Sequence, residues 1–227
     1  MRAIDFPDLL EKIAALRASV NIRGEGRTTQ QTEVWIASRL VPTLAHIGLI
    51  GFPLEFSFAD RPDLRLQVPA GAVGIEITEV VPPAYAQADA IRNQHYPEAT
   101  IDRSIFTWGA QFTAAEIHRH LAHVGRKLAG PGWAGDSVER GWAAAVNEAI
   151  SVKCEKLNRP GFTICDRNWL AAYTSSPGPA LNMPHAATFL VHPKALGQHS
   201  FDAIFALTDR RMVILQNGSH EVHELVV

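Results

Sequence analysis

The stretch that decides the fold is "DRPDLRLQVPAGAVGIEITEVV", residues 60–81. It contains two runs of apolar residues, the second rich in β-branched side chains, and both runs are typical of strands. The four residues between them, "VPAG", have proline in the second position and glycine in the fourth, which favours a tight turn. We therefore predict a β-hairpin in which Val68 lies opposite Gly71.

This register brings two acidic side chains together. Asp63 falls directly opposite Glu76, with about 5 Å between the two Cβ atoms. Thr78 points to the same face as Glu76, because side chains alternate along a strand. Two carboxylates this close repel one another unless a cation lies between them. Oxygen ligands of this kind suit Mg²⁺ or Mn²⁺, and the alternative is an ordinary hairpin face exposed to solvent.

The rest of the chain favours an α/β (α+β) fold with a central mixed β-sheet flanked by helices. Apolar residues at helical spacing predict helices over residues 5–18, 30–46, 112–129 and 137–158. Further strands are predicted over residues 53–58, 168–174, 201–207 and 211–217, whereas residues 82–111 give no clear assignment. We expect a single domain over residues 1–227, with a helical extension over 1–28 and a core over 30–215.

Composition limits the classes of function. The 227 residues are 47% hydrophobic and 19% charged, with a net charge of -2. A protein that coats nucleic acid is usually far more basic, so binding to a polyanion needs a local patch or metal ions. The N-terminus lacks the apolar core of a signal peptide, and the most apolar run is interrupted by proline, histidine and glutamate. We expect no membrane association and a cytoplasmic location.

The order of the acidic motifs suggests a family. Pro62-Asp63, followed after a short turn by Glu76-Ile77-Thr78, resembles the PD-(D/E)XK nuclease superfamily, which has the restriction-endonuclease-like fold. In that superfamily a helix before the hairpin often supplies another acid, and here it offers Glu33. A more specific pattern looks like uncharacterised bacterial proteins of predicted-nuclease type. It consists of "RPDLRL…GIEITE", then I-x-x-K-x-x-K over residues 150–156, and then "NWL".

One residue departs from this pattern. The motif lysine of the superfamily belongs at position 78, where this chain has Thr78. That lysine is thought to orient the attacking water and to offset negative charge on the phosphate. Threonine is not a cation, so it cannot replace the lysine in these roles. Some members carry the lysine on a neighbouring helix instead. Lys153 and Lys156 are the candidates, because both flank one edge of the apolar stripe of their predicted helix. That stripe consists of Val146, Ile150, Cys154 and Leu157.

The resemblance implies a metal-dependent phosphodiester hydrolase, with DNA as the expected substrate. Asp63, Glu76 and the backbone carbonyl of Ile77 would bind one Mg²⁺ or Mn²⁺ ion, and Glu33 would bind a second ion or support the first through water. A metal of this kind polarises a phosphoryl oxygen and lowers the pKa of a bound water. We expect modest, metal-dependent affinity for nucleic acid. The sequence is also compatible with a homodimer.

In the same scheme, Lys153 or Lys156 stabilises charge on the phosphate and Thr78 forms a hydrogen bond within the site. The alternative is a catalytically inactive nuclease fold that serves as a binding module for nucleic acid or protein, and Thr78 supports it. A second alternative is a metal site built from the histidines of "HRHLAH", residues 118–123. It is weaker, because His118 and His120 do not share a helix face.

Overall fold

The central feature of the computed structural model is one mixed β-sheet. The structure describes residues 1–20, 28–123, 130, 132–157, 159–175, 180–191 and 201–226. Within them the sheet has eight strands in chain order: β1 (Arg2–Ala3), β2 (Leu54–Phe58), β3 (Leu64–Val68), β4 (Gly71–Glu79), β5 (Arg167–Tyr173), β6 (Ala203–Leu207), β7 (Arg211–Gln216) and β8 (Ser219–Glu224). β5 pairs in parallel with both β4 and β6, and every other pair is antiparallel.

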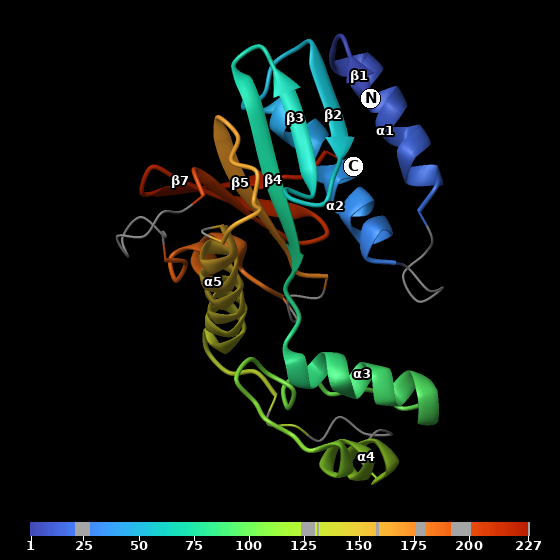
Figure 1. Cartoon of the computed structure of the whole chain (residues 1–227). Coiled ribbons are helices and arrows are strands. Elements are labelled where there is room, and N and C mark those ends of the chain that lie inside the picture. Colours follow the sequence, from blue (N-terminus) through green and yellow to red (C-terminus); the bar gives the residue numbers. More distant parts are fainter. Residues whose placement is uncertain are drawn as a thin grey trace.

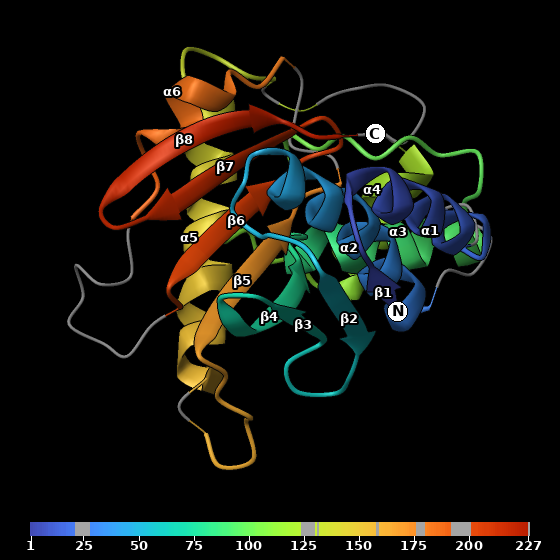
Figure 2. The same ribbon diagram turned by 90° about the horizontal axis from the view of Figure 1, so that it is seen from above.

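Helices cover both faces of this sheet. The described helices are α1 (Phe6–Ala18), α2 (Thr29–His46), α3 (Pro83–His95), α4 (Ala114–His123), α5 (Ser137–Leu157) and α6 (Met183–Ala187). α1 and α2 lie on one side, and α5 and α6 on the other (Figures 1 and 2). The expected α/β (α+β) class, a central mixed sheet flanked by helices, is confirmed.

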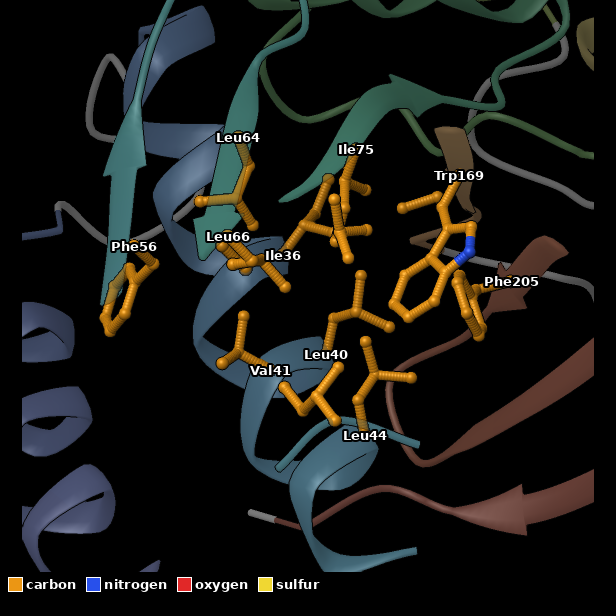
Figure 3. Close-up of a cluster of buried hydrophobic side chains, with 14 of the residues drawn as sticks. Ile36, Leu40, Val41, Leu44, Phe56, Leu64, Leu66, Ile75, Trp169 and Phe205 are labelled. Carbon is orange, nitrogen blue, oxygen red and sulfur yellow. The ribbon is translucent and has the colours of Figure 1, made fainter. Parts of the chain in front are cut away.

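The larger core lies between α2 and the sheet. α2 begins at a capping box, in which the Thr28 side chain accepts from Gln31 N and the Gln31 side chain accepts from Thr28 N. Its apolar face then packs on the inner side chains of β3, β4 and β5, and Figure 3 shows Leu40 and Leu44 among them. Each buried leucine contributes roughly 1.5–3 kcal/mol. This packing fixes the position of the N-terminal half of α2, which carries Glu33.

The second core lies between α5 and the opposite face of the sheet. Val146, Ile150, Cys154 and Leu157 are all buried there and belong to one cluster with Leu170 of β5. These four residues recur at the spacing of a helix face, so they form the apolar stripe predicted from the sequence. The stripe fixes how α5 is rotated about its axis, and therefore which side chains of α5 border β4.

A third, smaller core lies away from the sheet. α3 and α4 pack together beyond the end of β4 (Figure 1), around the buried Phe106, Ile117 and Leu121. α3 falls in residues 82–111, for which no helix or strand was predicted. α4 begins one residue after Thr113, whose backbone N–H and hydroxyl both donate to Glu116 Oε2. The predicted extension of this helix over residues 124–129 lies outside the described residues.

The ends of the chain contribute to the main sheet and its core. β1 pairs with β2, and Leu9 and Ile13 of α1 belong to the larger core, so residues 1–20 are integrated with the residues expected as the core. β8 extends the sheet past residue 215. Among the described helices, none is both long enough and apolar enough to cross a membrane.

Candidate carboxylate and lysine site

The predicted register of the hairpin is confirmed. Val68 pairs with Gly71, and Leu64 pairs with Ile75. Asp63 precedes Leu64 by one residue, so the same register carries it to the position opposite Glu76. The side chain of Asp63 is partly buried, and its Oδ2 accepts a hydrogen bond of 2.6 Å from Ile77 N. This bond anchors the Asp63 carboxylate to the backbone of β4.

Pro62 and Gly74 set the position of Asp63. Pro62 is buried, and a Cβ atom added to Gly74 would lie 2.7 Å from Pro62 Cγ and 3.0 Å from Cys165 Sγ. A side chain at position 74 is therefore excluded unless Pro62 or Cys165 moves. The absence of a Cβ lets Pro62 approach β4 and hold the next residue, Asp63, over the strand. Pro62 and Gly74 can both be read from the sequence, but their contact is found only once the register of the β3–β4 hairpin is known.

Lys153 of α5 reaches the acidic pair. Its Nζ atom donates to Glu76 Oε1 at 2.6 Å and to the backbone carbonyl of Ile77 at 3.1 Å. The side chains of Lys153 and Glu76 are only 13% and 11% exposed, so this ion pair is largely shielded from water. Lys153 is next to the buried Cys154, at the edge of the apolar stripe, and this position directs it toward β4.

The other predicted site residues occupy different surroundings. Lys156 is exposed and lines a cavity of about 210 Å³ together with Asp60, Arg61, Glu76 and Arg159. Thr78 is partly buried on β4, two residues after Glu76 and therefore on the same face. The structure thus brings together Asp63, Glu76, the Ile77 carbonyl and Lys153, and leaves Lys156 at the rim.

The charges of Asp63, Glu76 and Lys153 act on the carboxyl group of Glu33. Its pKa rises from 4.5 to about 7, mainly because of burial and in addition because of the charges on Asp63 and Glu76, while Lys153 partly opposes the rise. Burial also raises the pKa of Asp63 to about 6, against the hydrogen bond from Ile77 N, which lowers it. Glu33 and Asp63 therefore gain protons at a higher pH than free carboxyls do.

The oxygen atoms of this site suit a hard cation in part. Glu76 Oε2 is buried and receives no hydrogen bond from the described residues, so it offers an unused ligand atom. Against this, no group of three or more histidine, cysteine, aspartate and glutamate residues within those residues is arranged to hold a metal. Mg²⁺ usually needs only one or two protein carboxylates, with water and substrate phosphate completing its shell. Asp63 and Glu76 satisfy that smaller requirement.

The histidines of α4 make contacts of their own. His118 Nδ1 lies 3.2 Å from the Tyr96 hydroxyl, and the ring of His120 packs edge-on against Phe106. Across the ranges that the structure describes, these residues belong to no metal-binding group. Their contacts support the packing of α4 on α3, and the histidine alternative gains no support.

Comparison of the chain with protein-family models, with curated proteins and with solved structures gave no significant match. The resemblance to the PD-(D/E)XK superfamily therefore rests on the residues quoted above, and the restriction-endonuclease-like fold remains an inference from them.

Proposed function

We propose that this protein is a metal-dependent phosphodiester hydrolase of the restriction-endonuclease-like class, with DNA as its substrate. The observation that carries the proposal is the position of Lys153, whose Nζ atom lies 2.6 Å from Glu76 Oε1 and 3.1 Å from the Ile77 carbonyl oxygen. A lysine from a neighbouring helix thus supplies a cation beside the strand position where Thr78 replaces the motif lysine. This arrangement supports the migrated-lysine form of the superfamily site.

In this proposal Asp63 and Glu76 bind the divalent metal ion. Glu76 Oε2 is one of the ligand atoms, because it is buried and receives no hydrogen bond from the described residues. A bound Mg²⁺ or Mn²⁺ ion supplies positive charge to a phosphoryl oxygen and acidifies a water. Lys153 stabilises the negative charge that develops on the phosphate, because it is held in place by two hydrogen bonds in a shielded site. Glu33, with a pKa of about 7, can take up a proton near neutral pH.

The rim of the site supports a phosphodiester substrate. Arg61, Lys156 and Arg159 line the cavity that borders Glu76, so its lining has three cationic side chains against two acidic ones, Asp60 and Glu76. Cations of this kind bind phosphate groups and position a nucleic-acid backbone. The net charge of -2 makes tight, nonspecific coating of DNA unexpected, so binding should depend on the divalent cation.

A catalytically inactive binding module is the second candidate, and one observation favours it. Lys153 already neutralises Glu76 and donates to the Ile77 carbonyl, which are two of the expected metal ligands. With Glu76 paired in this way, the site has less need of a metal for its charge balance. A cytoplasmic location and self-association also stay predictions.

Cleavage assays separate the two candidates. Purified protein is incubated with plasmid and with single-stranded DNA in Mg²⁺ or Mn²⁺, and the products are followed on gels. The hydrolase proposal expects cleavage by the wild-type chain and its loss in Asp63→Ala and Glu76→Ala. Cleavage that both substitutions leave unchanged removes these residues from the site. DNA binding with no cleavage in either metal supports the inactive module.

A further inference from the structure

A second hollow lies at the other end of α5, and no step proposed above uses it. The cavity has a volume of about 410 Å³, within the roughly 300–1,000 Å³ typical of small-molecule sites. It lies between the α3–α4 region and the ends of β4 and β5, where Val80 and Thr174 border it. Aromatic rings from separate segments form much of its lining, namely Tyr85, Phe106, Trp108, Trp133 and Trp142.

A few polar groups accompany these rings. The guanidinium of Arg103 lies over the Tyr85 ring, 4.3 Å from its centroid. The Thr174 hydroxyl accepts from Trp142 Nε1 at 3.2 Å, which leaves its own hydrogen as a donor. Aromatic walls, one stacked cation and a few hydroxyls are the surroundings that suit a flat aromatic ring with polar edges and an anionic group beside it. A nucleobase with its phosphate has this chemistry.

The cavity and the carboxylate site lie on the same side of the sheet. Val80 follows Glu76 by four residues, which separates them by about 13 Å along β4. On α5, Ala145 at the cavity precedes Lys153 by eight residues, or about 12 Å. A stacked nucleic-acid strand advances about 3.4 Å per nucleotide, so this distance spans about four nucleotides, and fewer in a more extended strand.

We propose that this cavity takes up one unstacked nucleobase of the polynucleotide whose phosphodiester bond lies at Asp63 and Glu76. The proposal rests on the proposed function, because it assumes a nucleic-acid strand at that site. It adds a substrate preference, namely single-stranded or distorted DNA, in which a base leaves the stack at low cost.

Trp133 is the best residue to test. It is partly buried and lines the cavity, and it is not part of the three apolar clusters found in the described residues. Its ring is therefore free of a structural role in those cores, and Trp133→Ala should fold. Trp133→Phe keeps an aromatic face and serves as the matched variant.

Binding is measured with Ca²⁺ in place of Mg²⁺ by fluorescence anisotropy, and gels check that the probes stay intact. The probes are a fluorescein-labelled single strand of 12 nucleotides and the same strand with every base removed. We expect the wild-type chain and Trp133→Phe to bind the complete strand about tenfold more tightly than the abasic strand, and Trp133→Ala to lose this difference. Equal affinities of the wild-type chain for both strands, or no binding of either, overturn the proposal.

Cleavage in Mn²⁺ then locates the base. Strands with a single abasic position are compared, and we expect one position, about two to four nucleotides from the cleaved bond, to slow cleavage by the wild-type chain but not by Trp133→Ala. Cleavage that is insensitive to every abasic position overturns the cavity assignment and leaves the hydrolase intact. Base-dependent binding that Trp133→Ala abolishes, with no cleavage of any strand, supports the cavity and overturns the hydrolase.

Discussion

Lys153 Nζ lies 2.6 Å from Glu76 Oε1, although the two residues are 77 positions apart in the chain. The pair joins α5 to β4 on the face where Asp63 also lies. Because both side chains are nearly buried, the pair affects stability as well as any chemistry at the site. The first two predictions separate these two consequences.

The first prediction concerns the role of Lys153 in cleavage. Lys153→Met removes the shielded cation and should lower the rate of DNA cleavage by about 100-fold or more, the effect expected for loss of one preorganised electrostatic contact. Lys156→Met is the matched control on the same helix. It should change the rate by less than about tenfold, because Lys156 is exposed at the rim. Equal losses in the two variants would contradict the assignment of Lys153.

The second prediction concerns stability. Lys153→Met leaves the nearly buried Glu76 without its partner, and we expect a loss of about 3 kcal/mol in the free energy of unfolding, measured with urea. The double variant Glu76→Gln/Lys153→Met removes the unpaired charge and should recover part of that loss. A double variant less stable than Lys153→Met alone would show that charge pairing is not the cause.

The third prediction concerns pH. The folded chain binds a proton at Glu33 more tightly than the unfolded chain does, because the pKa rises from 4.5 to about 7. This contribution to stability is fully present below pH 4.5 and is lost as the pH rises through about 7. Relative to Glu33→Gln, the wild-type chain should therefore lose about 1–2 kcal/mol of unfolding free energy between pH 4.5 and 8, a value reduced for the partial exposure of Glu33. Parallel curves for the two proteins would contradict the raised pKa.

The fourth prediction concerns divalent cations. An ion held by Asp63 and Glu76 should lower the pKa of Glu33 and release part of its proton at pH 7, because the cation opposes the charges that raise that pKa. Calorimetric titration with Mn²⁺ in two buffers of different ionisation enthalpy measures the protons released. Glu33→Gln should bind Mn²⁺ with a smaller release, and Asp63→Asn/Glu76→Gln should bind weakly or not at all. A wild-type chain that takes up no Mn²⁺ would favour the inactive module.

The fifth prediction concerns the contact behind Asp63. Gly74→Ala puts a Cβ atom 2.7 Å from Pro62 Cγ, so Pro62 must shift and Asp63 must shift with it. We expect a loss of about 1–3 kcal/mol in stability and a lower cleavage rate. Gly51→Ala is the control, because nothing lies within 4 Å of its added Cβ atom. Comparable losses in both variants would remove the special role of Gly74.

Local patterns in the sequence were sufficient for much of the fold. The turn "VPAG" set the hairpin register, since Val68 and Gly71 close a two-residue connection and every further pair follows from them. The spacing of Ile150, Cys154 and Leu157 likewise indicated the buried face of α5 before its partner was known. α3 escaped detection because only Ala84 and Ala88 of that helix are buried, so its apolar pattern is weak.

The sequence by itself determined which residue types the site contains and that Asp63 and Glu76 face one another, because a hairpin register is a local property. It left Lys153 and Lys156 as equal candidates. Only the tertiary structure decided between them, because the rotation of α5 depends on how its apolar stripe packs against β5, a strand distant from the hairpin in sequence. The aromatic cavity beside α5 also depends on tertiary packing, since it joins segments whose approach no local pattern specifies.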